Sequence, residues 1–153
     1  MNIKSQQKGL YIVEFAIASG VFFLMMFGAI EVARLMFTWS ALDAMTQRGA
    51  RIAAVCPIND AAVKQIAIFG GNIVPGVTTD NISVEYLQLD GTTPGTNIGN
   101  TRFVRVEITD YQHQMLIPAT VANFAAPLLT APPFTTLRPA ESLGANPGGS
   151  DFC

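Results

Sequence analysis

The feature that most restricts the fold of this chain is a long apolar run near its start. Residues 10–30 read LYIVEFAIASGVFFLMMFGAI, and Glu14 is the one charged side chain in the run. As a helix, the run would cover about 32 Å, enough to cross the hydrocarbon core of a bilayer. A helix of a water-soluble domain has a polar face, and this run has none. The run therefore predicts a transmembrane helix.

The residues before the run predict its orientation in the membrane. Residues 1–9 read MNIKSQQKG, with Lys4 and Lys8 and no acid. Basic residues beside a span favour the cytoplasmic side, so we expect the rest of the chain outside the cytoplasm. A cleavable signal peptide would have a shorter apolar core followed by a small-x-small site, and no such site ends this run.

Glu14 needs a physical explanation, because a carboxylate within a span is costly. Insertion scales give about 2.5–3.5 kcal/mol for a charged residue at the helix centre and less near the interface. Two interpretations fit the sequence. Glu14 lies in the headgroup region beside water and Lys8, or it meets a positive partner within the membrane.

The leader and the start of the run resemble type IV pilin precursors. In that family a short basic leader ends in Gly, and Glu occupies the fifth position of the mature chain. Here Lys8-Gly9 precedes Leu10, and cleavage after Gly9 would place Glu14 fifth. Classical type IVa pilins usually begin their mature chain with Phe, so Leu10 departs from that branch.

The chain is more similar to TadE-like pseudopilins of tight-adherence (Flp) pilus systems. Their first helix begins G-x-x-x-x-E-F-A and continues into a stretch rich in Arg with Gly or Ala. This sequence has Gly9, Glu14 and Phe15 at those positions and TQRGARIAA at residues 46–54. The similarity is strong over residues 8–56. Because the main Flp pilin is much shorter, the resemblance implies a larger, minor subunit.

The resemblance implies a set of partners and a location. A prepilin peptidase would cut between Gly9 and Leu10, and Glu14 would neutralise the new amino terminus of a neighbouring subunit. Other pilin subunits, the pilus assembly platform and the lipid bilayer are the further partners. The implied location is the bacterial inner membrane, with the amino terminus cytoplasmic and the head periplasmic, or the assembled extracellular pilus. The implied role is assembly of an adhesive pilus.

One alternative to this role stays open from the sequence. The chain would then be a single-pass membrane-anchored interaction domain of another envelope or secretion complex. That protein would keep its leader, whereas a pilin precursor loses it.

Beyond the membrane the first helix is expected to continue as an amphipathic extension over residues 31–56. Glu31 and Arg34 are three residues apart, so one helix face brings them together. Pro57 is expected to stop the helix. The apolar residues proposed to form a helix interface, with the chain's own head or with a neighbouring helix, are Phe15, Val32, Leu35, Met36, Trp39 and Leu42.

The exported head is expected to span residues 57–143 and to belong to the α+β class. A short helix over 60–69 would be capped by Asp60 and end at Gly70-Gly71. A small antiparallel sheet would pack against the long first helix. We expect its strands in three segments, 81–89 and 102–109, joined as a hairpin by a long loop, and 133–141. Residues 116–132 predict a short helix or loop, and residues 144–153 a flexible tail.

The rest of the sequence contains no pattern typical of an enzyme, so we expect no catalytic residue, no cofactor and no metal site. The single histidine, His113, lies in a polar segment and is expected at the surface. Only 13% of residues are charged and Lys and Arg are not clustered, which argues against nucleic-acid binding. The acids around the hairpin lack the spacing of a calcium loop, and we expect a solvated rim from Asp80, Glu85, Asp90 and Glu107.

The two cysteines, Cys56 and Cys153, cannot form a CxxC motif or a four-ligand zinc site. Outside the cytoplasm an oxidising compartment would permit a disulfide between them. Two unpaired thiols fit the sequence equally well.

Overall fold

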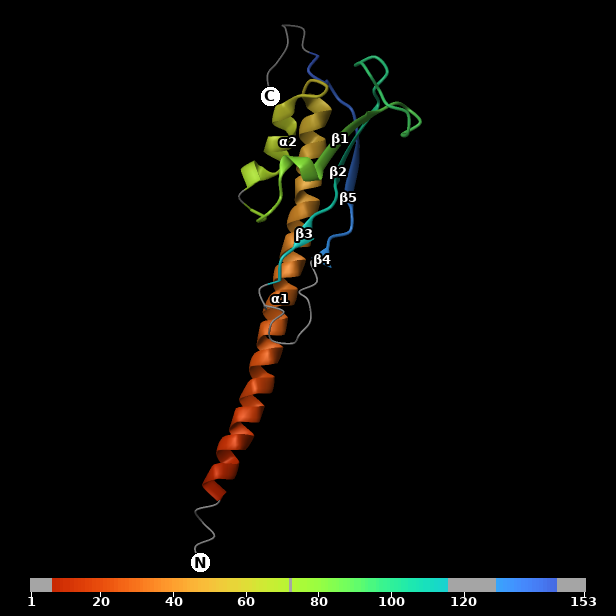
Figure 1. Cartoon of the computed structure of the whole chain (residues 1–153). Coiled ribbons are helices and arrows are strands. Elements are labelled where there is room, and N and C mark those ends of the chain that lie inside the picture. The colour runs from red at the N-terminus through yellow and green to blue at the C-terminus, as the bar shows by residue number, and fades with distance from the viewer. Residues whose placement is uncertain (1–6, 72, 116–128, 146–153) are drawn as a thin grey trace, which may run out of the picture. The chain divides into compact units, whose positions relative to one another are not determined.

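The computed structural model describes residues 7–71, 73–115 and 129–145, with side chains from Gly9 onward. These residues fall into two compact units. The first contains α1 up to Met36, and the second begins at Phe37 and contains the sheet. A long helix followed by a small antiparallel sheet confirms the predicted α+β class (Figure 1).

The first helix, α1, runs without a break from Gln7 to Val55. No proline occurs in this stretch, so every backbone N–H beyond the first turn is available for helical bonding. The last such bond joins the Cys56 N–H to the Ile52 carbonyl at 2.9 Å. Pro57 follows and disfavours helical geometry in the residue before it, so the predicted stop is confirmed.

The second helix, α2, spans Ala61–Ala67 and is capped as predicted. Asp60 has extended backbone geometry, and its carboxylate accepts a hydrogen bond from the Ala62 N–H at 2.8 Å. After α2 the chain makes a 3-10 turn, η2, at Phe69–Gly71. Gly70 and Gly71 there have φ angles of 68° and 78°, which glycine adopts without strain.

The main sheet has the order β1-β2-β5 and is antiparallel throughout. A 3-10 turn, η3, leads into β1, and the bounds are η3 Thr79–Asn81, β1 Ile82–Leu87, β2 Phe103–Ile108 and β5 Phe134–Pro139. The predicted hairpin and third strand are therefore confirmed. Val106 is the centre of the register, opposite Val84 on one side and Thr136 on the other.

The hydrophobic core belongs to the second unit, where one face of the sheet packs on α1 and α2. The Thr46 and Thr136 hydroxyls, 2.9 Å apart, join α1 to β5 across this core. Val104, Val106 and Ile108 alternate toward it along β2, as a half-buried strand requires. The largest fully buried side chains are Leu42, Met45, Ile82, Ile108, Val63, Val74, Val104, Val106 and Thr46.

Two parts of the chain differ from the sequence-based expectation. Leu129–Thr130 forms a short strand, β4, which pairs with β3 at Gln112–His113. The sequence predicted a helix or loop there, because the segment contains three prolines and a strand of two residues has no recognisable sequence pattern. The other residues of that segment, 116–128, lie outside the described residues. In the tail, the Gly144 N–H donates to the Val55 carbonyl at 2.7 Å, and residues 146–153 lie outside the described residues.

Candidate functional site

The predicted processing junction lies near the start of α1. Leu10 follows Gly9 within this helix, and its side chain is 70% exposed. Glu14 is also exposed, and among the described residues it forms no ion pair. Glu31 has such a partner, since its carboxylate lies 3.2 Å from the Arg34 guanidinium, as predicted from their spacing. Of these two acids in the first unit, Glu31 therefore has a local counter-charge and Glu14 has none among the described residues.

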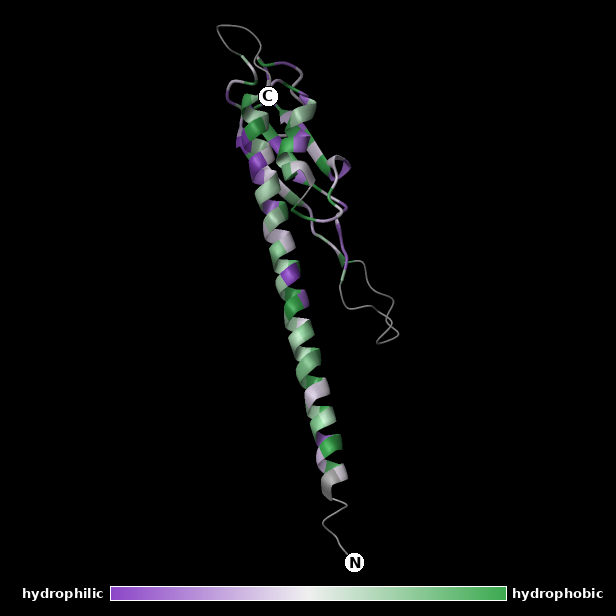
Figure 2. Cartoon of the chain, turned by 90° about the vertical axis from the view of Figure 1, so that its left-hand side faces the viewer, coloured by the Kyte–Doolittle hydropathy of each residue, from purple (hydrophilic) through white to green (hydrophobic). Residues whose placement is uncertain are grey.

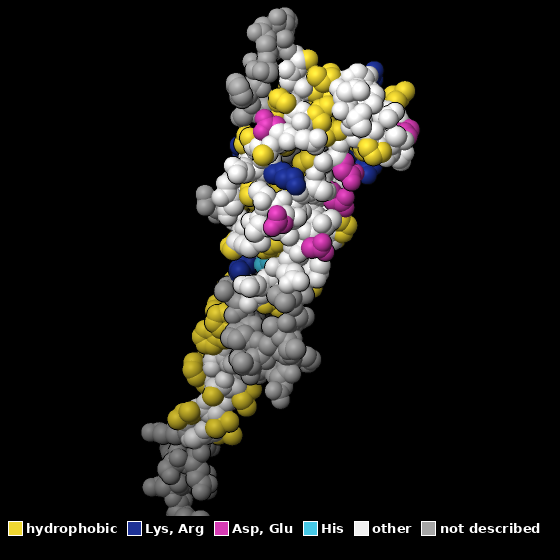
Figure 3. Space-filling view, turned by 45° about the horizontal axis from the view of Figure 1, so that its top comes forward, with side chains coloured by type: hydrophobic (Ala, Val, Ile, Leu, Met, Phe, Trp, Pro, Cys, Tyr) yellow, Lys and Arg dark blue, Asp and Glu magenta, His cyan; other side chains and the backbone are white. Residues whose placement is uncertain are grey.

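The apolar part of α1 exposes most of its large hydrophobic side chains. Among the described residues, one helix is long and apolar enough to cross a membrane; its most apolar window has a mean hydropathy of 2.1, and none of that window is buried. Hydrophobic residues dominate this part of the helix in Figure 2. In Figure 3 the visible Asp and Glu side chains lie over the second unit. Such a helix is suited to anchor the chain as a single membrane span.

The residues predicted to form a helix interface divide into two groups. Leu42 is fully buried in the core of the second unit, and Trp39 packs against that core. Phe15, Val32 and Met36 remain 74%, 56% and 53% exposed, and Leu35 is half-buried. The first group packs on the chain's own head, while the exposed group is available to lipid or to another helix.

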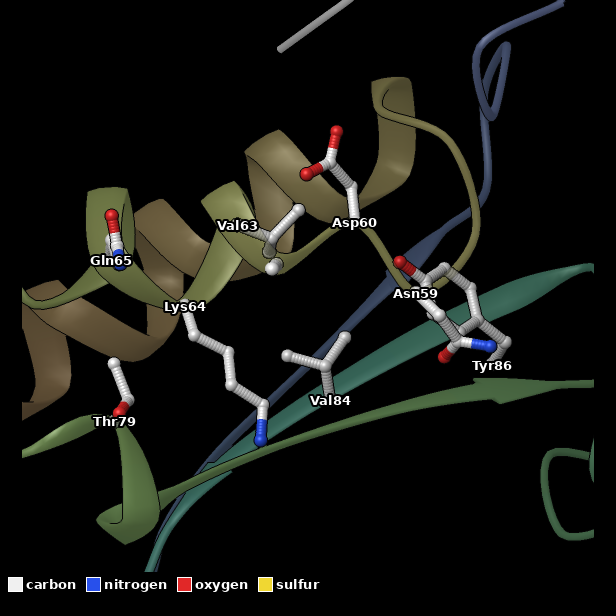
Figure 4. A pocket seen from close by; sticks show the side chains of 9 residues that line it. Asn59, Asp60, Val63, Lys64, Gln65, Thr79, Val84 and Tyr86 are labelled. Carbon is white, nitrogen blue, oxygen red and sulfur yellow. The ribbon is translucent and has the colours of Figure 1, made fainter.

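The head has a cavity of about 490 Å³ between α2 and the edge strand β1. Its walls come from the α2 segment and from η3 and β1; Lys64 extends toward β1 beside Val84, and Asn59 lies beside Tyr86 (Figure 4). A second cavity of about 260 Å³ shares Asn59, Val84 and Tyr86 with the first. The two cavities thus lie along one strand edge.

Two charged residues line the larger cavity, Asp60 and Lys64, and the Lys64 side chain extends from α2 toward β1 beside Val84 (Figure 4). Lys64 forms no ion pair with a described residue. Asp60 is oriented away from Lys64 in the same view, and its carboxylate caps α2. Burial raises the pKa of Tyr86, a hydrogen bond with the Asn59 backbone lowers it, and the Asp60 charge raises it. Tyr86 is therefore a neutral side chain at physiological pH.

The loop between β1 and β2 has its own hydrogen-bond network around Asp90. The Thr92 and Thr93 hydroxyls and amides donate to its carboxylate. Hydrogen bonds from Thr93, then Thr92, lower the pKa of Asp90 to about 2. Arg105 joins the loop to the sheet, donating to the Gly91 carbonyl at 2.9 Å and pairing with Glu85 at 3.1 Å. Two of the predicted rim acids thus have specific local partners.

Two sequence-based expectations concern Cys56 and His113. Cys56 is buried, and no described cysteine is a free thiol; Cys153 lies outside the described residues. The expectation that His113 is a surface residue was wrong, because only 3% of it is exposed. It lies in β3, whose pairing with β4 the sequence did not predict. Among the described residues, no group of three or more potential metal ligands was found.

The described residues thus combine a long apolar helix, compatible with a single membrane span, with a small antiparallel sheet. Residues 9–51 match the family model described as TadE-like protein. This match confirms the resemblance to TadE-like proteins of tight-adherence pilus systems, and it covers Gly9, Glu14 and most of α1. The comparisons with curated proteins and with solved structures each gave no significant match.

Proposed function

We propose that this chain is a minor pilin, or pseudopilin, that a prepilin peptidase cuts between Gly9 and Leu10. Its role is structural: it supports assembly of an adhesive tight-adherence pilus. The single observation that carries the proposal is the TadE-like match over residues 9–51, which contains the spacing from Gly9 to Glu14 on an exposed apolar helix. The leader stays cytoplasmic and the head lies outside, following the lysines of the leader.

The proposed role of Glu14 rests on its environment in α1. It is exposed on an apolar helix and has no counter-charge among the described residues. Cleavage would create an ammonium at Leu10, which supplies the counter-charge when two such helices pack together. Away from water this pair is much stronger than a surface pair, and a shifted register would leave a charge unpaired. Glu14 therefore sets the axial position of one subunit against its neighbour.

Processing is tested by co-expressing the full chain with the prepilin peptidase of its own system, followed by intact mass. Loss of residues 1–9 is the expected result. Gly9→Leu should block it, and Gly20→Leu is the matched control, because a Cβ atom added at either glycine has no neighbour within 4 Å. A retained leader in the unaltered chain would favour the anchored interaction domain, and cleavage after the apolar run would favour an ordinary signal peptide.

The register role is tested with Glu14→Gln and Glu31→Gln. Removing one member of a buried ion pair costs about 3–5 kcal/mol, so Glu14→Gln should reduce incorporated subunits more than about tenfold while processing continues. Glu31→Gln should have a smaller effect, because Glu31 pairs with Arg34 of the same helix, and i,i+3 pairs contribute about 0.2–0.5 kcal/mol. Equal pilus assembly in both variants would refute the role of Glu14.

The cysteine pair is part of the same proposal, because an exported head lies in an oxidising compartment. Cys56 would bond to Cys153 and hold the end of the chain against the end of α1. Alkylation of the denatured protein should then modify both cysteines only after reduction, as measured by intact mass. Full alkylation without reductant would exclude the disulfide.

A further inference from the structure

The outer edge of β1 has backbone groups that the sheet does not use. In the antiparallel register, Ser83, Glu85 and Leu87 exchange hydrogen bonds with β2, because Thr109 bonds to Asn81 and the pattern alternates along the strand. The amides and carbonyls of Ile82, Val84 and Tyr86 therefore face the opposite side. This side is where the two cavities lie.

Both ends of this edge are already occupied by the chain itself. The Ile82 N–H donates to the Thr79 carbonyl, which closes the edge at the start of β1. At the other end, Gly95 donates to the Tyr86 carbonyl at 2.8 Å, and Gln88 donates to Thr93 at the same distance. These bonds surround an antiparallel bridge between Leu87 and Pro94. The loop after β1 thus folds back and pairs with the outer edge of β1, and this pairing ends at Tyr86, before Val84.

Between these ends lies an open backbone segment centred on Val84. Among the described residues, no hydrogen bond outside the β1–β2 pairing was found to the Val84 amide, to its carbonyl or to the Ile82 carbonyl. An edge of this kind pairs readily with an added strand, whose main-chain bonds give affinity while adjacent cavities select side chains. Strand residues advance about 3.4 Å each, so the segment has room for about four residues.

The cavity beside this edge favours one sign of charge in the added strand. The added residue opposite Val84 would place its side chain on the same face of the sheet as the Val84 side chain. This is the face toward α2. The Lys64 ammonium lies on that face beside Val84 (Figure 4). Asp60 also lines the cavity, but its carboxylate points away from Lys64 and Val84 (Figure 4). A carboxylate opposite Val84 would therefore meet the cation.

We propose that the β1 edge between Thr79 and Gly95 binds a short extended segment of another polypeptide, which adds antiparallel to β1 at Val84 and carries an acidic residue facing Lys64. The residue of the added segment that lies opposite Val84 donates its N–H to the Val84 carbonyl and accepts from the Val84 N–H. The residue two positions later in that segment donates to the Ile82 carbonyl. This site shares no residue with α1, and it needs neither leader cleavage nor the Glu14 contact. Its failure would leave the proposed pilus role standing.

The test uses the full 15N-labelled chain in detergent micelles and the tetrapeptide acetyl-VEVT-amide, whose Glu is placed opposite Val84. Titration should shift the Val84 amide resonance most. The peptide acetyl-VKVT-amide should bind at least about tenfold more weakly, because it replaces attraction to Lys64 by repulsion. The variant Lys64→Glu should reverse this preference, and Lys64 is partly exposed on α2, so the fold is retained.

A second peptide control removes the backbone bond without changing the protein. N-methylation of the Glu nitrogen deletes the N–H that would donate to the Val84 carbonyl, and binding should be lost. Equal binding of VEVT, VKVT and the N-methylated peptide would overturn the proposal, as would shifts located away from β1. Self-association of the chain that Lys64→Glu abolishes, with no binding of VEVT, would overturn the acidic-peptide assignment in favour of a second copy.

Discussion

Gly49 is the position where the packing of the head is most sensitive to one added side chain. It lies on α1 where the helix meets α2 and β2. A Cβ atom at this position would lie 3.0 Å from the Ala67 Cβ and 3.2 Å from a Val106 methyl. Ala67 and Val106 are both fully buried, so neither neighbour can move toward solvent. The perturbation we consider is Gly49→Val.

Two opposing effects set the size of the change in stability. Valine is a better helix former than glycine by about 0.3–0.5 kcal/mol, which favours the variant. Overpacking a well-filled core costs about 1–3 kcal/mol, and here even the first added carbon is too close. The net expectation is a loss of about 2 kcal/mol in the free energy of unfolding. For a domain of the size of the second unit, that lowers the Tm by about 8–16 °C.

The assay is thermal unfolding of the full chain in detergent, followed by the near-ultraviolet circular dichroism of the head's aromatic residues. Gly28→Val is the matched control, because it is the same change in the same helix. A Cβ atom added at Gly28 has no neighbour within 4 Å. A Gly49→Val protein as stable as the Gly28→Val protein would refute the packing argument. The double variant Gly49→Ala with Ala67→Gly should be more stable than the two single changes predict by addition, since the second restores the space.

The remaining predictions concern two polar networks of the head. Asp90 should titrate near pH 2, measured by carboxyl carbon NMR, because its folded pKa is below the ordinary 3.8. The stabilisation of the fold by the ionised Asp90 carboxylate is present above pH 4 and is lost as pH falls through about 2. A titration midpoint near 3.8 would contradict this prediction. Thr46→Val removes the bond to the Thr136 hydroxyl and should cost about 1–2 kcal/mol in chemical unfolding, whereas Thr135→Val, at an exposed position, should be near neutral.

The sequence predicted the elements that depend on local chemistry. Asp60 caps α2 because its short carboxylate reaches the Ala62 N–H, and Pro57 ends α1 for steric reasons. The hairpin followed from the alternation of apolar and polar residues in Phe103–Ile108. The spacing of Gly9 and Glu14 led to the family later matched over residues 9–51. All of these signals lie within a few residues of one another.

The candidate binding edge could not be predicted in the same way, because it is created by tertiary packing. Lys64 and Val84 are twenty positions apart, and no periodic pattern links them. Which strand becomes an edge depends on the order β1-β2-β5. The burial of His113 was missed for a related reason, since it follows from pairing between β3 and β4 across a long separation in sequence.

The short open edge has a consequence for where its contact can form. An added strand closed in by Thr79 on one side and Gly95 on the other makes few hydrogen bonds, so its intrinsic affinity is low. Anchoring by α1 would hold this head and its partners in one plane at high effective concentration. A contact too weak to persist between freely diffusing proteins then becomes populated in the membrane. Such a contact would also separate quickly, and under the proposed pilus role this would allow a subunit to exchange partners during assembly.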